Sequence, residues 1–283
     1  VYVNGEWIDA GQPAVRVEDR GFQLGDGVYE VIRTYRGRPF ALDRHLARLR
    51  RSAGAIELDM PLGEADLRDL VYEAMARCGA PGEMQVYIQL TRGPAPRTHA
   101  FPAASRPTLV VYACPLPPAD PAQAEAGGAA ILLPDERWLR CDIKSTCLLY
   151  NVLAKERAHR AGAVEAILVR EGFGVTEGAS TNVFGGRGGR VITAPRGRYI
   201  LSGVTRDILL ELAREAGIPV EERPWTAEEL LACDEVFLTG TTTEVFPVVR
   251  IDDRPVGTGR PGPVVGRLRS LFLANVERYL DRG

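Results

Sequence analysis

Lysine is nearly absent from this 283-residue chain. Only Lys144 and Lys155 among its 35 basic residues are lysine, and the others are arginine. Arginine stays protonated and cannot act as an amine nucleophile, whereas a buried lysine can lose its proton and condense with a carbonyl. Either lysine is therefore a candidate for a chemical role, although composition alone is explained equally well by chance survival of two lysines.

Histidine and cysteine are also scarce. The histidines His45, His99 and His159 lie far apart in the sequence, and the five cysteines include no C-x-x-C pair. An odd number of scattered cysteines argues against a disulfide framework, and neither residue type shows the spacing of metal ligands. We expect no metal centre.

Long apolar runs and a charge excess of one sign are missing as well. No apolar run approaches the roughly 18 residues of a membrane span, and residues 1–10 lack a basic region followed by an apolar core. We therefore expect a cytoplasmic protein. The formal net charge is −2, with acidic and basic residues interleaved, so no broad basic face could follow a nucleic-acid backbone. We expect small-molecule partners, with no nucleic acid and no membrane.

The length and composition that are present fit a globular protein of about two domains. Hydrophobic residues make up 45% of the chain and charged residues 25%, and a domain usually contains roughly 150 residues. Four prolines lie between Cys114 and Pro121, and alanine and glycine follow them, which is typical of a linker. We expect an N-terminal domain over 1–119 and a C-terminal domain over 120–283 that carries Lys144.

Hydrophobic periodicity predicts strands and helices in both halves. The expected strands are 1–8 around an Asn4-Gly5 turn, 27–35, 84–91, 108–114, 129–133, 164–169, 181–184, 191–193 and 236–238, and the expected helices are 45–53, 64–77, 149–161, 204–216 and 268–279. The GGRGG segment, residues 185–189, is expected to be a turn. Strand-rich halves with segregated helices predict an α+β fold in which two sheets meet at an interdomain cleft.

The two lysines lie in different settings. Lys144 lies in RWLRCDIKSTCLLYN, between an expected strand and an expected helix, where side chains often project into a cleft. Lys155 lies inside the helix among charged neighbours, which is typical of a solvated face. Lys144 is thus the candidate nucleophile, and we assign no role to Lys155.

Three further segments could hold parts of a cofactor. Glu177 lies beside a glycine in VTEGASTN, and a carboxylate that faces a pyridine nitrogen keeps that nitrogen protonated. Segments 202–206 and 240–243 offer backbone amides and hydroxyls suited to phosphate. Taken singly, each is better explained as an ordinary turn or helix cap. Neither phosphate candidate matches a P-loop, which disfavours nucleotide binding.

Together, the lysine, the acid and the two loops resemble the fold-type IV family of pyridoxal-phosphate enzymes, which contains D-amino acid and branched-chain aminotransferases and aminodeoxychorismate lyase. The resemblance spans nearly the whole chain, in the order DRGFQLGDGVYEVIRTY, HLARLRRSA, RWLRCDIKS, NVLAKERAH, VTEGASTNVF and LSGVTRD. It implies pyridoxal 5'-phosphate as the cofactor, Lys144 as the Schiff-base lysine and Glu177 as the partner of the pyridine nitrogen.

The resemblance also implies a set of phosphate-binding groups. Arg48 would reach the cofactor phosphate, although it shares a helix with other arginines and such a stripe is usually solvated. Backbone amides around Val204 and Thr205, and the loop of Thr241 and Thr242, would complete the site. The chain departs from the D-specific relatives at Gly240, where they carry serine. His45 and His159 are interpreted as structural or exposed residues without a local partner.

The segment TRGPAPRTHAFP looks specifically like the D-amino acid aminotransferases. In that subfamily an arginine and a histidine, here Arg97 and His99, join a tyrosine, here Tyr29, to hold the substrate α-carboxylate. All three side chains can donate to a carboxylate, and positions i and i+2 can project in the same direction. By spacing alone, an R-x-H triplet is more typical of a solvated loop.

The resemblance therefore implies a ping-pong exchange of amino groups between D-amino acids, such as D-alanine, and 2-oxo acids, such as 2-oxoglutarate. Lys144 would move the substrate α-proton. In these relatives the loop carrying Arg97 and His99 reaches the neighbouring subunit, which implies a homodimer. Branched-chain L-amino acid aminotransfer and aminodeoxychorismate lyase activity remain alternatives. A non-catalytic cofactor-binding protein is a further alternative. The retention of Lys144 and Glu177 argues against it.

Overall fold

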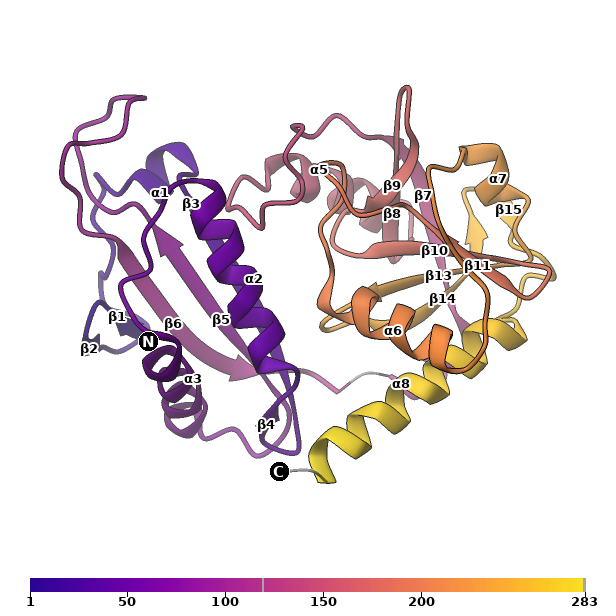
Figure 1. Cartoon of the computed structure of the whole chain (residues 1–283), viewed down its shortest axis with the longest axis horizontal. Helices are drawn as coiled ribbons and strands as arrows, with labels where there is room; N and C mark the ends of the chain where they lie inside the picture. The colour runs from indigo at the N-terminus through magenta and orange to yellow at the C-terminus, as the bar shows by residue number, and fades with distance from the viewer. Residues whose placement is uncertain (119, 282–283) are drawn as a thin grey trace. The chain divides into compact units, whose positions relative to one another are not determined.

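The structure is a computed structural model that describes residues 1–118 and 120–281, except for the side chain of Pro121. The chain divides into two compact units, one comprising Val1–Pro118 and Ile143–Cys147, the other Ala119–Asp142 and Leu148–Gly283 (Figure 1). Each unit combines one sheet with helices. The expected α+β class is confirmed.

The first unit is built on a six-stranded antiparallel sheet. Its strand order is β2-β1-β6-β5-β3-β4. The strands are β1 (Tyr2–Val3), β2 (Glu6–Trp7), β3 (Gly27–Tyr35), β4 (Arg38–Pro39), β5 (Met84–Thr91) and β6 (Thr108–Pro115). Alternation along β5 buries every second residue, as expected for a strand with one face against a core.

Three helices belong to this unit: α1 (Arg20–Leu24), α2 (Leu42–Ala55) and α3 (Glu64–Cys78). Leu42, Leu46 and Leu49 recur at helical spacing on α2 and are at most 2% exposed. They pack in one core with Val28 and Ile32 of β3. This packing fixes α2 against β3 and so determines which α2 side chains face the residues at the start of that strand.

The segment Ile143–Cys147 completes the first unit, although it lies well inside the half that the sequence assigned to the C-terminal domain. Its backbone pairs with the start of β3: the Tyr29 N–H donates to the Lys144 carbonyl at 3.0 Å, and the Thr146 N–H donates to the Gly27 carbonyl at 3.0 Å. Short β4 pairs with β3 only at Thr34 and Tyr35, so this stretch of the β3 edge is open to the segment. Lys144 therefore belongs structurally to the first unit.

The second unit contains a nine-stranded mixed sheet, in the order β12-β11-β10-β13-β14-β7-β8-β9 with β15 paired to β14. The strands are β7 (Gly128–Pro134), β8 (Glu165–Arg170), β9 (Gly174–Gly178), β10 (Asn182–Arg187), β11 (Arg190–Thr193), β12 (Val220–Glu222), β13 (Glu235–Gly240), β14 (Glu244–Ile251) and β15 (Arg254–Pro255). Strand β7 runs parallel to both of its neighbours, β8 and β14.

The helices of the second unit are α4 (Pro121–Ala126), α5 (Leu149–Arg160), α6 (Val204–Glu215), α7 (Ala227–Leu231) and α8 (Pro263–Asp281). Helix α6 is amphipathic and buries most of its length, whereas α5 buries only Ala154 and Ala158 among its side chains. Across the described ranges, no helix combines the length and apolar character needed to cross a membrane.

One sequence expectation for this unit is wrong in part. The GGRGG segment is not a turn throughout, because β10 continues through Gly185 and Gly186 to Arg187, and the turn is confined to 188–189. A Cβ on Gly185 would come within 2.6 Å of the Cys233 Sγ, so glycine here permits close packing and not a bend. The expected linker also contains a short helix, α4, because the Asp120 carboxylate accepts from the Ala122 N–H and caps it.

Candidate active site

Lys144 is held by its backbone, while its amine has no polar partner among the residues that the structure describes. Its N–H donates to the Ser52 hydroxyl at 3.1 Å, and its carbonyl accepts from Tyr29. The Nζ atom lies 4.2 Å from the centre of the Tyr29 ring, and across residues 1–118 and 120–281 no protein acceptor takes a hydrogen bond from it. A half-buried amine over an aromatic face, without a carboxylate partner, is suited to reaction with a carbonyl.

The Lys155 amine, in contrast, has polar partners. Its Nζ donates to the Val164 carbonyl at 2.6 Å and lies 3.4 Å from a carboxylate oxygen of buried Glu165. The other carboxylate oxygen of Glu165 accepts from the Ser180 and Thr181 hydroxyls. Lys155 therefore has a structural role in bracing the turn that follows Glu177, which sequence reasoning did not assign.

Arg48 lies one helical turn before Ser52 on α2, and its side chain belongs to a buried polar trio. Its Nε and Nη2 donate to the two carboxylate oxygens of Glu30 at 2.7 and 2.9 Å. The Nδ1 atom of His45 lies 2.8 Å from the same carboxylate. All three side chains are at most 5% exposed. His45 thus has a partner, contrary to the sequence-based interpretation, because Glu30 on β3 faces α2.

Burial shifts the pKa values of Glu30 and His45 in opposite directions. Burial favours the neutral acid of Glu30, but Arg48 and His45 outweigh it and hold the pKa of Glu30 well below its usual range. Burial is the largest influence on His45 and lowers its pKa, although Glu30 opposes the shift. Each folded-state pKa lies below its unfolded value. The trio therefore stabilises the fold at neutral pH, and its contribution falls as the pH decreases, first below about 6.5 for His45 and later below about 4.3 for Glu30.

We expect Glu30→Gln to lower the stability of the apo protein by about 3 kcal/mol at pH 7, because it leaves the Arg48 charge buried without its carboxylate. Urea unfolding followed by circular dichroism measures the change. The control is Glu64→Gln, which removes an exposed ion pair with Arg50 and should cost at most about 1 kcal/mol. Equal losses in the two variants would contradict the assignment of stability to the buried trio.

The loop that carries Arg97 and His99 projects both side chains into solvent, but its backbone is clamped. The buried Arg20 guanidinium donates to the carbonyls of Thr98, His99 and Ala100 at 2.6, 3.4 and 3.3 Å. Among the residues that the structure describes, neither the Arg97 nor the His99 side chain bonds to Tyr29. Within one chain, then, Tyr29 lies next to Lys144, and the other two proposed carboxylate ligands are not joined to it.

Arg20 is itself held by a partly buried acid. The Asp26 carboxylate accepts from the Nε atoms of both Arg20 and Arg92, at 2.7 and 2.8 Å. The Arg92 guanidinium also stacks 3.7 Å from the centre of the Phe101 ring. The start of the loop, at Arg92, and its middle, which Arg20 holds, are therefore tied to the same carboxylate, and this fixes the backbone from which Arg97 projects.

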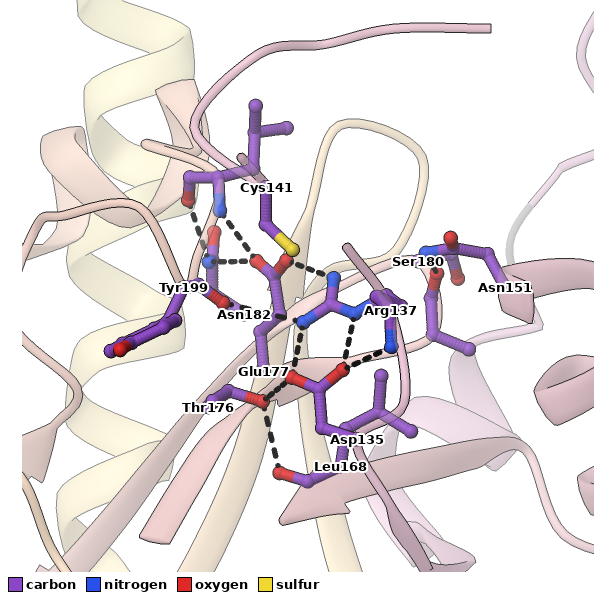
Figure 2. A network of polar contacts seen from close by, with 12 residues as sticks. Asp135, Arg137, Cys141, Asn151, Leu168, Thr176, Glu177, Ser180, Asn182 and Tyr199 are labelled. Carbon is purple, nitrogen blue, oxygen red and sulfur yellow. Dashed lines mark hydrogen bonds and ion pairs between the residues drawn. The ribbon is translucent and has the colours of Figure 1, made fainter. Parts of the chain in front are cut away.

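Glu177 is the centre of a polar network in the second unit (Figure 2). Its Oε1 accepts from the Arg137 Nη1 at 2.5 Å, and its Oε2 accepts from the Asn182 side-chain amide at 3.0 Å and the Leu201 N–H at 2.9 Å. Burial raises the pKa of Glu177, and Arg137 and the Leu201 N–H oppose that shift. The result is a rigid carboxylate at the end of β9, suited to a cationic N–H.

Asn182 links Glu177 to the start of α6. Its side-chain amide also donates to the Leu201 carbonyl at 2.9 Å. A Cβ on Gly203 would lie 2.1 Å from the Asn182 Oδ1, so this position requires glycine. Gly203 is the N-cap of α6 and supplies no side-chain cap, which leaves the helix N-terminus, with Val204 and Thr205, suited to an anion.

The Gly240–Thr242 loop lies beside the same region. Thr239 of β13 pairs with Asn182 of β10, and Thr181 is the closest side chain to Gly240 after Thr243. The buried hydroxyl of Thr239 has no hydrogen-bond partner within the described part of the chain. A Cβ on Gly240 would make ordinary contacts of 3.4–3.5 Å, so the serine of the D-specific relatives would fit here without a clash.

The second unit thus brings together Glu177, Val204 and Thr205 with the loop of Thr241 and Thr242, and the first unit brings together Lys144, Tyr29 and the Arg48 helix. Sequence reasoning missed four groups that position them: Glu30, Asp135, Arg137 and Asn182. Arg137 gave no signal because it is one of 33 arginines. Asn182 could have been found, since a polar residue in an otherwise apolar strand, NVF, needs a partner when buried.

Comparison with known proteins identifies similar chains. A model of the amino-transferase class IV family matches residues 27–251. The D-alanine aminotransferase of Bacillus licheniformis is 44% identical over 276 residues, covering 98% of this chain and 96% of that protein. The D-alanine aminotransferase of Staphylococcus haemolyticus is 43% identical over 279 residues, covering 98% of each.

Solved structures are similar at lower identity. The branched-chain amino acid aminotransferase of Escherichia coli superposes with a TM-score of 0.87 at 27% identity, covering 96% of this chain and 92% of that one. The T.th. branched-chain amino acid aminotransferase, complexed with N-(5'-phosphopyridoxyl)-L-glutamate, gives 0.87 at 29% identity, covering 97% and 93%. The fold is therefore shared by proteins named for different substrates, so the substrate must be argued from individual residues.

Proposed function

The chain belongs to the class IV aminotransferases, which use pyridoxal phosphate, and on that premise we propose that it exchanges amino groups between D-amino acids and 2-oxo acids. One observation carries the aminotransferase chemistry: of the two lysines, Lys155 has structural bonds, whereas the Lys144 amine lies unpartnered over Tyr29. The 40–44% identity with D-alanine aminotransferases supports the choice of D-amino acids.

The described residues fit this cofactor. Bound pyridoxal phosphate supplies an aldehyde that condenses with amines and a ring that accepts electrons. Lys144 offers the amine, and Glu177 offers a fixed buried carboxylate for the ring nitrogen. The uncapped N-terminus of α6, with Val204 and Thr205, and the Thr241 and Thr242 loop offer donors for the phosphate. Arg48 is the cationic member of the phosphate site in this proposal, with Glu30 fixing its guanidinium.

Lys144 acts twice in the proposed reaction. Lys144 would hold the cofactor when it is bound, and once an incoming amino acid had freed its amine, that amine would be the base that takes up the substrate α-proton. The backbone bonds from Ser52 and Tyr29 keep the lysine main chain fixed while the side chain moves. The same amine would then deliver that proton to the cofactor carbon, so a single residue would serve both directions of the exchange.

Tyr29, Arg97 and His99 are the proposed ligands of the substrate α-carboxylate. Each can donate a hydrogen bond to an anion, and Arg97 adds a full charge. Because the Arg97 and His99 side chains project into solvent from a clamped loop, we propose that they serve the site of a second copy in a homodimer. An apolar stripe on α5 supports association, since Leu149, Val152 and Leu153 are 75%, 59% and 49% exposed.

Mixing two inactive variants tests the shared site. An Arg97→Ala chain and a Lys144→Ala chain, dissociated and reassembled together, should regain activity, because each hybrid dimer holds one site with both residues intact. At random pairing half of the dimers are hybrids with one intact site, so about a quarter of the wild-type activity is expected. Each variant reassembled alone is the control. Recovery no greater than these controls would place Arg97 and Lys144 in the same chain's site.

Substrate class is tested by mixing the purified holo protein with D-alanine, and separately with L-leucine, and following the cofactor absorbance. Conversion to the pyridoxamine form by D-alanine alone supports the D-amino acid proposal. Conversion by L-leucine alone would favour the branched-chain alternative, for which the structural similarity at 27–29% identity is the specific observation. No conversion, or no bound cofactor, would favour a non-catalytic protein.

A further inference from the structure

Arg137 lies between two buried carboxylates, and its guanidinium has donors directed to both (Figure 2). Its Nε and Nη2 donate to the two oxygens of Asp135, each at 2.9 Å, and its Nη1 donates to the Oε1 of Glu177 at 2.5 Å. The Arg137 side chain is 6% exposed, and those of Asp135 and Glu177 are 0% and 7% exposed. A bidentate pair on one side and a single bond on the other define its orientation.

Asp135 is in turn fixed by further donors. The Thr176 hydroxyl donates to its Oδ2 at 2.8 Å, and the Arg170 Nη2 lies 3.0 Å from its Oδ1. Two arginines and two carboxylates thus form a cluster whose formal charges cancel. Cys141 is a further titratable group near Glu177, and burial raises its pKa to about 11, so it is neutral at physiological pH.

We propose that Arg137, which Asp135 orients, is a positioning residue that determines, through Glu177, whether the ring nitrogen of the cofactor is protonated. The inference rests on the proposed function, because it requires that Glu177 faces that nitrogen. Neither Asp135 nor Arg137 needs to touch cofactor or substrate. Arg137 acts on the charge of Glu177, and Asp135 acts on the orientation of Arg137.

The physical basis is competition for one proton. A carboxyl group and a pyridine nitrogen in contact can share a proton as a carboxylate with a pyridinium, or as a neutral acid with a neutral ring. Burial favours the neutral pair, because desolvation penalises charge. Arg137 bonds directly to the carboxylate and therefore stabilises its ionised form. The proton then stays on the nitrogen, where it makes the ring a better electron acceptor.

The test is the ¹⁵N chemical shift of the ring nitrogen in holo protein loaded with labelled cofactor, which reports protonation without any turnover. In the wild type we expect the shift of a protonated ring. In Arg137→Gln the shift should move toward that of a neutral ring, and Arg137→Lys, which restores the charge, should move it back. Asp135→Asn keeps the arginine charge and one acceptor oxygen for the guanidinium, so its shift should remain close to that of the wild type.

The outcomes separate this inference from the proposed function. Glu177→Gln should give the chemical shift of a neutral ring. If this variant instead shows the same protonated ring as the wild type, both the role of Glu177 and the inference are overturned. A normal Glu177→Gln effect combined with an unchanged Arg137→Gln shift would overturn the inference alone. If Arg137→Gln does not fold because two carboxylates remain buried together, Asp135→Asn/Arg137→Gln removes one charge of each sign and gives the same test.

Discussion

Lys144→Arg is expected to abolish transamination, with a loss of at least about 10³-fold in kcat, because the variant lacks the amine that acts as nucleophile and proton carrier. Arginine retains the positive charge beside Tyr29, so the loss isolates amine chemistry from charge. Single-turnover absorbance measurements with D-alanine would check the rate. Reduction with borohydride followed by peptide mass analysis would show whether the cofactor is still attached to the chain.

The second lysine is the matched control. Lys155→Arg preserves a donor for the Val164 carbonyl and the charge beside Glu165, and leaves Lys144 as the only lysine in the chain. It should keep near wild-type activity and yield a single reduced cofactor adduct on the peptide containing Lys144. An adduct on Lys155 in the wild type, or turnover by Lys144→Arg close to normal, would disprove the assignment.

Arg97→Gln is expected to lower kcat/KM for D-alanine by about 10²–10³-fold, because the substrate carboxylate would lose its charged donor in a desolvated site. Steady-state kinetics across D-alanine concentrations measure the change. The backbone of this loop is held by Arg20 through the carbonyls of Thr98, His99 and Ala100, so a change of side chain should leave the loop in place. Cofactor affinity should stay unchanged.

Arg106→Gln is the control for charge, since it removes another exposed arginine from the same connection between β5 and β6. We expect less than a twofold effect from it. Similar losses in the two variants would indicate that general positive charge, and not a specific carboxylate ligand, attracts the substrate. If Arg97→Gln lowers the activity toward L-leucine and not the activity toward D-alanine, Arg97 would belong to a site for branched-chain amino acids.

Much of the fold could be predicted from periodicity. The expected strand 84–91 matches β5 (Met84–Thr91), and the expected helix 64–77 falls one residue short of α3 (Glu64–Cys78). These elements have one buried face, so their spacing records their environment. The expected strand ended before β10 does because two glycines, Gly185 and Gly186, follow. Gly185 approaches Cys233 and Trp225, which are distant in the sequence. Helix α4 was missed because prolines precede it.

The proposed nucleophile stands out in the sequence because its residue type is rare, whereas proposed site groups of common residue types do not. Lys144 stood out because lysine is scarce, and its unpartnered amine agrees with that choice. Glu30 and Arg137 did not stand out, because their roles come from contacts between strands and helices that lie 15 to 40 residues apart. Local sequence contains no record of such pairings.

The way the segment Ile143–Cys147 joins the first unit affects how the protein can be made. The ribosome delivers Val1–Pro118 early, yet the open edge at the start of β3 receives its partner only after Cys147 has emerged. The first unit therefore cannot finish folding as an independent N-terminal piece, and translation of the β7 region must precede its completion. A nascent chain arrested before this segment would expose the Gly27–Tyr29 edge, which is a site where chaperones or aggregation could act.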